Sequence, residues 1–322
     1  MLVSGKFWTV DTMYFTEIDQ SKLLPRFLYY VATQLPYAYW VTSTALPSMT
    51  QSDLASARIP YIDRAEQAAI AAFLDRETAE IDAFIRDQEE LIRLLNERRA
   101  AIEFATFAPL IHIRDSPAPD EFAPMSALIC EKDVRAGMKT LELYSVSIHH
   151  GVVRWSQLHD KLPKAEDFTA YKQIQPGEIV LNRMRAFQGA VGQAFANGMV
   201  SPDYGVFSVR AGYAPEFVHM LMRSAPFVDA MRLRLRGIGD EASGAIRTPR
   251  INARDLLRIR VAVCAPHEQA ALLKAFNNEV VENEASISDA QQAIALLRER
   301  RSALISAAVT GKIDVRKRVR GA

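Results

Sequence analysis

The sequence predicts an α+β fold in which a mixed helix-and-strand domain is joined to two long helices that pair antiparallel as a coiled coil. Three observations predict it. A long stretch with heptad spacing occurs twice along the chain. The residues between its two copies alternate short apolar strands with loops that carry Gly, Pro and Asn. The composition is that of a globular protein, with 49% hydrophobic and 24% charged residues among 322.

The composition also excludes several classes of protein. The net charge is +1 at pH 7, so the chain as a whole is no strong polyanion binder, and a nucleic-acid surface must be a local patch. The two cysteines, Cys130 and Cys264, form no CxxC pair, which argues against a disulfide framework and a structural zinc site and predicts a cytoplasmic protein. No apolar run approaches the roughly 20 residues of a membrane helix. We therefore expect no membrane partner.

The heptad-patterned stretch occurs in two copies at a constant offset of 202 residues. The sequence EQAA at residues 66–69 returns at 268–271, and the pattern LL-x-ERR at residues 94–99 returns at 296–301. No gap is needed over about fifty-five residues. Two unrelated amphipathic helices would share their periodicity but not these letters at one offset, so we interpret the pattern as an internal duplication.

Each copy predicts the order strand, short helix, connector, strand, long helix. The segment 11–15 (DTMYF) resembles the segment 203–207 (DYGVF). The second copy has about ninety more residues ahead of this part, at 109–200, whereas the first copy has almost none. Residues 1–57 are therefore predicted to be the remnant of a domain whose complete copy is 109–262. A remnant without a sheet partner leaves apolar surface uncovered, so we expect exposed side chains at Phe7, Trp8, Tyr14 and Phe15.

Long helices are predicted at 58–108 and 263–316, each with about 40 helical residues that span about 60 Å. Asp63 and Glu66 form a capping box at the start of the first helix, and Gly311 can take the left-handed conformation at the end of the second. A narrow apolar stripe does not bury itself alone, so the two helices are predicted to pair. The periodicity also fits a simple spacer or dimeriser. The seam is predicted at Ile70, Leu74, Ile81, Phe84, Leu91, Leu95 and Ile102 of the first helix and at Leu273, Phe276, Val280, Ile287, Ile294, Leu297 and Leu304 of the second.

The mixed domain is predicted to have short strands at 140–148, 178–184, 204–209 and 258–263. Within this domain, the basic residues are concentrated after residue 150. Guanidinium groups donate two hydrogen bonds to guanine, and side-chain amides recognise adenine, so arginine beside Asn or Gln is suited to base edges and phosphates. Clustered arginines are also commonly solvent-facing or paired with carboxylates, and composition does not separate these alternatives. The candidates for DNA contact are Arg154, Lys172, Asn182, Arg183, Arg185, Gln188, Arg236 and Arg247.

No motif assembles a catalytic or metal centre. His149-His150 has no third ligand at helical or loop spacing, and HEQAA at 267–271 is not HExxH. Gly311-Lys312 lacks the earlier glycine of a phosphate loop, and the glycine-rich segment 237–244 lacks the spacing of a dinucleotide fold. We expect no catalytic residue, no metal and no cofactor.

Four segments carry a resemblance to a known family: residues 66–102, YKQIQPGEIVLNRMRAFQGAVG at 171–192, MVSPDYGVF at 199–207, and LRERRSALISAAVTGKIDVR at 297–316. With them the sequence resembles the DNA-specificity subunit of type I restriction–modification systems over essentially its whole length. The resemblance implies that 109–262 is a target-recognition domain that reads half of a bipartite site on double-stranded DNA. It also implies a subunit that does no chemistry itself, in a complex that methylates DNA.

The resemblance further implies partners. The conserved helices dock two methyltransferase subunits, and the motor-nuclease subunit joins that complex. The basic tail 317–322 follows the second helix. The docking residues carried over to this sequence are Phe84, Leu91, Leu95, Ile102, Ile287, Ile294, Leu297 and Leu304.

The sequence departs from the family pattern at its front, because a full member begins with a complete first recognition domain. A truncated or decayed gene, a recombining partial copy and a half-subunit each explain residues 1–57. A half-subunit would restore a two-part site by pairing with a second copy. A coiled-coil dimerising scaffold without DNA reading is the alternative function, and an enzyme that acts alone is disfavoured by the missing motifs.

Overall fold

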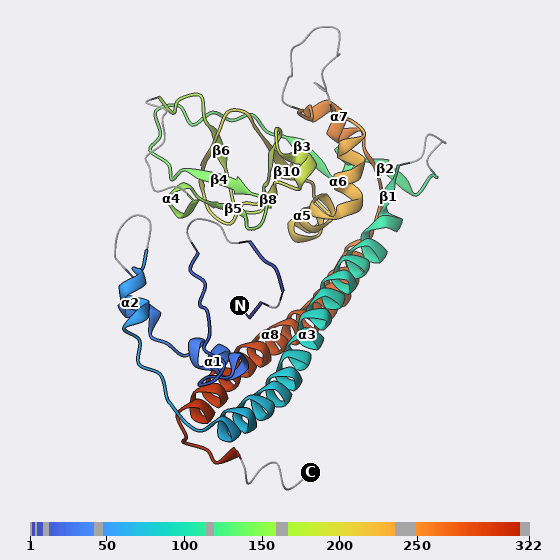
Figure 1. Ribbon diagram of the computed structural model, residues 1–322. Helices are drawn as coiled ribbons and strands as arrows, with labels where there is room; N and C mark the ends of the chain where they lie inside the picture. The colour runs from blue at the N-terminus through green and yellow to red at the C-terminus, as the bar shows by residue number, and fades with distance from the viewer. Residues whose placement is uncertain are drawn as a thin grey trace. The chain divides into compact units, whose positions relative to one another are not determined.

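The structure, a computed structural model, describes residues 2–3, 5–8, 13–41, 48–113, 119–158, 167–235 and 249–315 (Figure 1). The chain forms two compact units. Unit 1 contains residues 1–95 and 285–322, and unit 2 contains residues 96–284. Each long helix contributes residues to both units. Among the described helices, none is long and apolar enough to cross a membrane.

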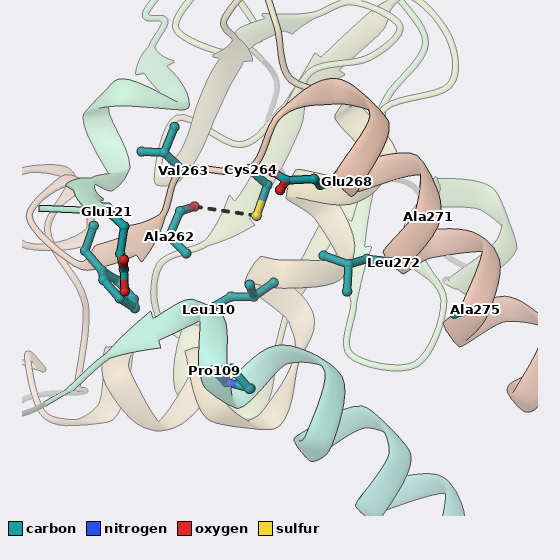
Figure 2. Close-up of a pocket in the computed structure, with 11 residues that line it drawn as sticks. Pro109, Leu110, Glu121, Ala262, Val263, Cys264, Glu268, Ala271, Leu272 and Ala275 are labelled. Atoms are coloured by element: carbon teal, nitrogen blue, oxygen red, sulfur yellow. Dashed lines mark hydrogen bonds between the residues drawn. The ribbon is translucent and has the colours of Figure 1, made fainter. Parts of the chain in front are cut away.

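Unit 2 is built on small antiparallel sheets, as its short strands and turn-rich loops predict. One sheet has the order β1-β11-β2, and its strand β11 leads through Cys264 into the second long helix (Figure 2). A second sheet has the order β3-β10-β7-β8, and two further pairs are β4-β5 and β6-β9. The strands are β1 Ile111–His112, β2 Phe122–Pro124, β3 Ile129–Glu131, β4 Tyr144–Ser147, β5 Gly151–Arg154, β6 Lys172–Ile174, β7 Ile179–Asn182, β8 Val191–Gln193, β9 Gly198–Val200, β10 Tyr204–Val209 and β11 Arg260–Ala262.

The four strand segments predicted from the sequence in this unit each contain an observed strand. Strand β10 begins and ends at the predicted residues, and β4, β7 and β11 are shorter than the predicted segments. Between and after the strands lie short helices. They are α4 Trp155–Leu158, α5 Pro215–Arg223, α6 Ala225–Arg232 and α7 Ala253–Leu257, with single 3-10 turns at η2 Ala108–Leu110, η3 Met125–Ala127 and η4 Ala186–Gln188.

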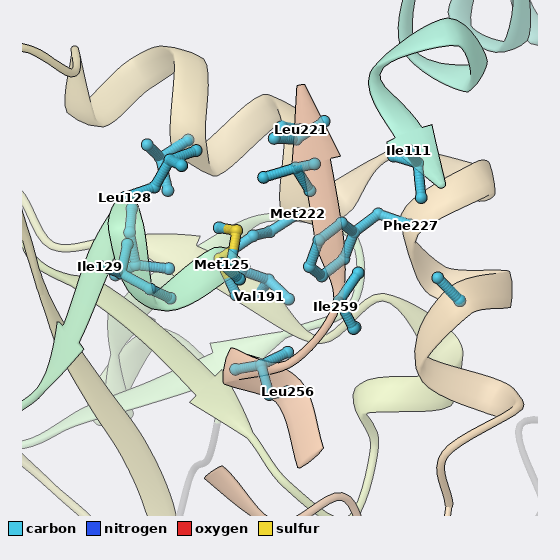
Figure 3. Packing of buried hydrophobic residues seen from close by; sticks show 14 of the residues in the cluster. Ile111, Met125, Leu128, Ile129, Val191, Leu221, Met222, Phe227, Leu256 and Ile259 are labelled. Atoms are coloured by element: carbon cyan, nitrogen blue, oxygen red, sulfur yellow. The ribbon is translucent and has the colours of Figure 1, made fainter. Parts of the chain in front are cut away.

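The core of unit 2 lies between its sheets and the helices α5 and α6. Met125, Leu221 and Phe227 are fully buried there and pack against Ile259, which lies between α7 and β11 (Figure 3). Pro215 at the first position of α5 costs no hydrogen bond, because the first amides of a helix have no partner within it. The last turn of the first long helix joins this core through Phe107, whose ring lies edge-on to Phe276 with 5.3 Å between centroids.

Unit 1 has a smaller core around the other ends of the long helices. Phe27 and Tyr30 of α1 (Pro25–Ala32) are buried against Phe73, Leu74 and Ile305. The remaining short elements are η1 Tyr37–Tyr39 and α2 Gln51–Ala55, which begins with a capping box between Thr50 and Asp53.

The described part of residues 1–57 contains no strand, so the strand expected near 11–15 is wrong for Met13–Phe15, while residues 11–12 lie outside the described residues. A strand needs a neighbour to satisfy its amides and carbonyls, and among the described residues no strand lies beside this segment. Phe7, Tyr14 and Phe15 are exposed, and Trp8 is 96% exposed. The expectation of uncovered apolar surface is therefore confirmed for these side chains.

The two long helices are α3 Arg64–Phe107 and α8 Pro266–Val309, each of 44 residues. Asp63 accepts hydrogen bonds from the amides of Ala65 and Glu66, which is one half of the predicted capping box, and Gly311 has a φ of 71° after the end of α8.

The two helices run antiparallel where they meet within each unit, as predicted. In unit 1 the Arg301 Nε lies 2.8 Å from the Asp82 Oδ1. In unit 2 the Arg99 guanidinium lies 3.1 Å from the Glu284 carboxylate. Asp82 and Arg99, moved by the offset of 202, become Glu284 and Arg301. One ion pair is therefore the repeat equivalent of the other, which supports the internal duplication.

The predicted seam is confirmed on α8 and partly wrong on α3. Every predicted seam residue of α8 is buried or half-buried. On α3, Leu74 and Ile81 are buried, but Phe84 is 60% exposed and Leu91 is also exposed. From Leu74 onward, the inward-facing positions of α3 are spaced alternately four and three residues apart. The predicted seam positions are spaced in the opposite order, three and then four residues apart. The seam of α3 therefore continues through Thr78, Ile85, Gln88, Ile92, Leu95 and Ile102, which are buried or half-buried.

The duplication is also visible in one buried side chain in each unit. In unit 1, Gln67 donates hydrogen bonds to the carbonyls of Lys22 and Ile62, both at 2.9 Å, and accepts one from the amide of Leu24 at 2.8 Å. The side chain thereby joins the first turn of α3 to the residues just before α1. We call this arrangement the glutamine clamp.

Unit 2 repeats the glutamine clamp at the equivalent residue. Gln269 donates to the carbonyls of Gly212 at 3.0 Å and Cys264 at 2.8 Å, and accepts from the amide of Ala214 at 2.9 Å. It joins the first turn of α8 to the residues just before α5. Because the same three contacts occur at equivalent places in both units, the duplicated sequence corresponds to a duplicated structure.

Candidate nucleic-acid interface

The loop that follows β7 presents two of the predicted DNA-contacting side chains. Its turn is closed by hydrogen bonds from the amide of Arg185 to the carbonyl of Asn182 and from the amide of Gln188 to the carbonyl of Arg185, both at 3.0 Å. Gly189 ends the turn with a φ of 79°, a conformation that favours glycine. Ala186 is buried beneath the turn, and Arg185 and Gln188 are exposed. We call residues 183–189 the β7–β8 loop.

Arg183, at the start of this loop, is held by a carboxylate. Its guanidinium forms an ion pair with Glu131 of β3, and only about a fifth of its side chain is exposed (21%). This is the carboxylate-paired alternative that the sequence left open. Asn182 is buried in β7, where its side-chain oxygen accepts a hydrogen bond from the amide of Met184. Arg183 and Asn182 therefore stabilise the start of the loop and are less accessible to DNA than its exposed residues.

Lys172 lies inside the sheet region, with 4% of its side chain exposed and 3.6 Å between its Nζ and the Asp133 carboxylate. Burial lowers the pKa of this lysine and the nearby Arg183 lowers it further, while Asp133 and Glu131 raise it. A buried lysine in this position is suited to neutralising the negative charge of Asp133 and Glu131, and it is poorly placed to contact a DNA duplex.

The remaining residues predicted to contact DNA lie outside the β7–β8 loop. Arg154 is exposed at the end of β5. Arg236 and Arg247 lie outside the described residues.

Two arginines that the sequence analysis did not select hold the loops of this region in place. Arg223 of α5 donates to the carbonyl of Ile148 at 3.0 Å and to that of His149 at 2.7 Å, which fixes the tip of the β4–β5 hairpin. Arg232 of α6 donates from its Nε to the carbonyl of Phe187 at 3.0 Å, which fixes the β7–β8 loop. No sequence signal pointed to these contacts, because their acceptors are main-chain atoms far along the chain.

The hairpin tip and the β7–β8 loop meet at a polar hollow of about 390 Å³. Burial lowers the pKa of Arg223, and the Glu103 carboxylate raises it. Close by on α5, burial lowers the pKa of His219 to about 4, and the neighbouring Arg223 contributes to this shift. At neutral pH this histidine is therefore uncharged. The hollow is lined by Glu103, Ile148, Gln188, Gly189, Arg223, Ala225, Val228, Asp229 and Arg232.

The predicted docking residues on the long helices fall into two groups. Phe84 and Leu91 are exposed on α3. Leu95, Ile102, Ile287, Ile294, Leu297 and Leu304 are half-buried or buried, on the side where the helices face each other. Among the described residues, no group of three or more His, Cys, Asp or Glu side chains is arranged to hold a metal ion.

Comparison with known proteins shows which solved structures have a similar fold. No protein-family model and no curated protein sequence matches the chain. A solved structure titled "Structural basis underlying complex assembly and conformational transition of the type I R-M system" matches with a TM-score of 0.59 and 13% identity, over 90% of this chain and 72% of that chain.

Two further structures match less closely in space. The HsdS subunit from Thermoanaerobacter tengcongensis matches with a TM-score of 0.49 and 14% identity, over 92% of this chain and 72% of that chain. The type I restriction–modification S subunit from M. genitalium matches with a TM-score of 0.36 and 14% identity, over 91% of this chain and 74% of that chain. The match with a TM-score of 0.59 shows that the chain has the fold of a type I restriction–modification subunit.

Proposed function

We propose that the chain is a sequence-specific DNA-recognition subunit of a type I restriction–modification complex, and that residues 109–262 read half of a bipartite site. The proposal rests on the β7–β8 loop within this fold. Arg185 and Gln188 are exposed there on a turn whose main chain is fixed by Arg232. A guanidinium and an amide on a rigid turn are suited to the edges of guanine and adenine in the major groove.

The long helices are the proposed dock for methyltransferase subunits. Within unit 1, α3 exposes Phe84, Leu91 and Leu94. Their spacing of seven and three residues places them on one side of the helix. Exposed apolar residues gathered in this way mark a surface that a partner covers. The motor-nuclease subunit joins through the complex, the chain itself catalyses no reaction, and it needs no cofactor.

A selection experiment tests the reading function. The full chain, assembled with the methyltransferase subunit, is incubated with duplexes of random sequence, and the bound duplexes are sequenced. We expect enrichment of one short motif. We also expect an affinity for the enriched duplex that falls as salt rises, because each neutralised phosphate contributes a slope of about −0.9 to log K against log salt.

The alternative function, a coiled-coil scaffold without DNA reading, predicts a different outcome of the same experiment. Such a scaffold assembles with the methyltransferase subunit and enriches no sequence. Assembly without enrichment would therefore reject the reading function and retain the docking function.

A self-dimer is a second proposal, supported by the uncovered aromatic residues of unit 1. Trp8 and Phe15 are exposed there, and Phe15 lies edge-on to Phe7 with 6.1 Å between ring centroids. If a second copy covers this surface, sedimentation equilibrium of the purified chain will give twice the monomer mass. The double variant Trp8→Ser, Phe15→Ser will then shift the chain toward monomer. A wild-type chain that stays monomeric at micromolar concentration would reject this proposal.

A further inference from the structure

An apolar hollow of about 580 Å³ opens in unit 2, where the first turns of α8 approach β2, β11 and the end of α3 (Figure 2). Leu110 and Leu272 extend toward each other across it, from the turn after α3 and from α8 (Figure 2). Phe122 and the buried Cys264 also contribute to its wall. The complete lining is Pro109, Leu110, Glu121, Phe122, Ala262, Val263, Cys264, Glu268, Ala271, Leu272 and Ala275.

The charges in the lining are all negative. Glu121 and Glu268 are exposed carboxylates, and no Lys, Arg or His is among the lining residues. One oxygen of Glu268 accepts a hydrogen bond from the amide of Ala265 at 2.7 Å, which holds this carboxylate beside Cys264. A group that enters the hollow is therefore favoured if it brings a positive charge beside its apolar part.

The equivalent face of the duplicated helix is closed in unit 1. Positions 70 and 73 of α3 correspond to 272 and 275 of α8 at the offset of 202. Position 73 is Phe73, which is 1% exposed within the unit 1 core, whereas its equivalent Ala275 is exposed and lines the hollow. In one copy a ring is buried at this position, and in the other a methyl group faces open space.

The residues that follow the long helices differ in the same sense. Val315, after α8, is 3% exposed and joins the unit 1 core with Phe73. Its equivalent after α3 is Ile113, which is 38% exposed. In sequence, the segment that covers the unit 1 face has Ile313 and Val315 on either side of Asp314, and it is preceded by Lys312 and followed by Arg316. The chain thus contains its own example of what covers such a face: aliphatic side chains flanked by basic residues.

We propose that the hollow in unit 2 receives an aliphatic or aromatic side chain, flanked by Lys or Arg, from the methyltransferase subunit. The inference rests on the proposed function and adds an anchor point at the base of the DNA-reading domain, separate from the exposed residues of α3. The apolar side chain fills the space that Phe73 fills in unit 1, and the flanking cation lies near Glu121 and Glu268. An anchor of this kind is typical of the few side chains that dominate a protein interface.

The substitution Ala275→Phe tests the proposal, because it fills the hollow with the residue that the duplicated copy already uses. Affinity of the purified full chain for the purified methyltransferase subunit is measured by titration calorimetry. We expect Ala275→Phe to raise the dissociation constant by about thirtyfold, as for loss of one anchor, and Ala275→Leu to raise it less. Ala270→Phe is the matched control, since Ala270 is exposed on the same helix and does not line the hollow.

The outcomes separate the inference from the function on which it rests. Weaker binding by Ala275→Phe and Ala275→Leu, with unchanged melting temperature and unchanged binding by Ala270→Phe, supports the anchor. Unchanged binding by folded Ala275→Phe or Ala275→Leu overturns the anchor and leaves the proposed function intact. A wild-type chain that does not bind the methyltransferase subunit rejects the docking function, and the anchor with it.

Discussion

Replacing Gln269 with Leu is expected to lower the free energy of unfolding by about 2–4 kcal/mol, because one buried and two partly buried hydrogen bonds to main-chain groups are lost. Gln269 is 1% exposed, and its glutamine clamp satisfies the amide of Ala214 and the carbonyls of Gly212 and Cys264. Each buried polar group left without a partner costs about 1–3 kcal/mol, and the three costs do not add fully. Urea denaturation of the purified variant measures the change.

Two further variants make this measurement specific. Gln269→Glu keeps an acceptor for the amide of Ala214 but places a carboxylate against two carbonyls, so we expect it to be at least as destabilising as Leu. Gln291→Leu is the control, because Gln291 is exposed on the same helix, and surface changes of this kind stay within about 0.5 kcal/mol. A loss below about 1 kcal/mol for Gln269→Leu would show that the clamp contributes little to stability.

The largest effect on DNA recognition is expected from the double variant Arg185→Ala, Gln188→Ala. Each specific base contact discriminates by about 1–3 kcal/mol, so loss of two should reduce the preference for the selected duplex over a scrambled duplex by about a hundredfold or more. Both side chains are exposed, so the variant should fold with nearly unchanged stability. Competition binding between the two duplexes, at one fixed salt concentration, measures the preference.

The controls distinguish base reading from general charge. Lys274→Ala also removes an exposed cation, on α8, and should leave the preference unchanged. Arg183→Ala removes the partner of Glu131, so we expect it to change the unfolding curve more than the preference. If the double variant keeps the wild-type preference, the β7–β8 loop does not read bases, and the reading residues lie elsewhere in the domain.

The fold could be predicted from the sequence where local spacing determines it. The seam of α8 follows directly from apolar residues at heptad positions, and Gly311 ends this helix as expected. On α3 the prediction failed at Phe84 and Leu91, because both are large apolar residues at acceptable spacing, and burial instead favoured Ile85 and Ile92 one position along. Two adjacent apolar residues leave the phase of a helix undetermined until its partner is known.

The candidate site was less predictable, because its contacts join residues that are distant in sequence. Arg183 looked like a DNA contact until Glu131, 52 residues earlier, was found beside it. Lys172 was likewise predicted to contact DNA, and it is buried in β6. Arg223 and Arg232 bond to main-chain carbonyls, which carry no signature of residue type. Among the described candidates Arg154, Arg185 and Gln188 are exposed, and of these Arg185 and Gln188 share one loop.

The glutamine clamp has a consequence for how such proteins diverge. Its partners just ahead of α1 and α5 are backbone atoms, so it places no demand on which side chains stand there: Lys22 and Leu24 occupy those places in one unit, Gly212 and Ala214 in the other. A side chain that bonds only to main-chain atoms can hold any domain whose backbone follows the same path. Domains of different sequence can therefore replace one another by recombination, or diverge, while the backbone hydrogen bonds that hold them stay the same.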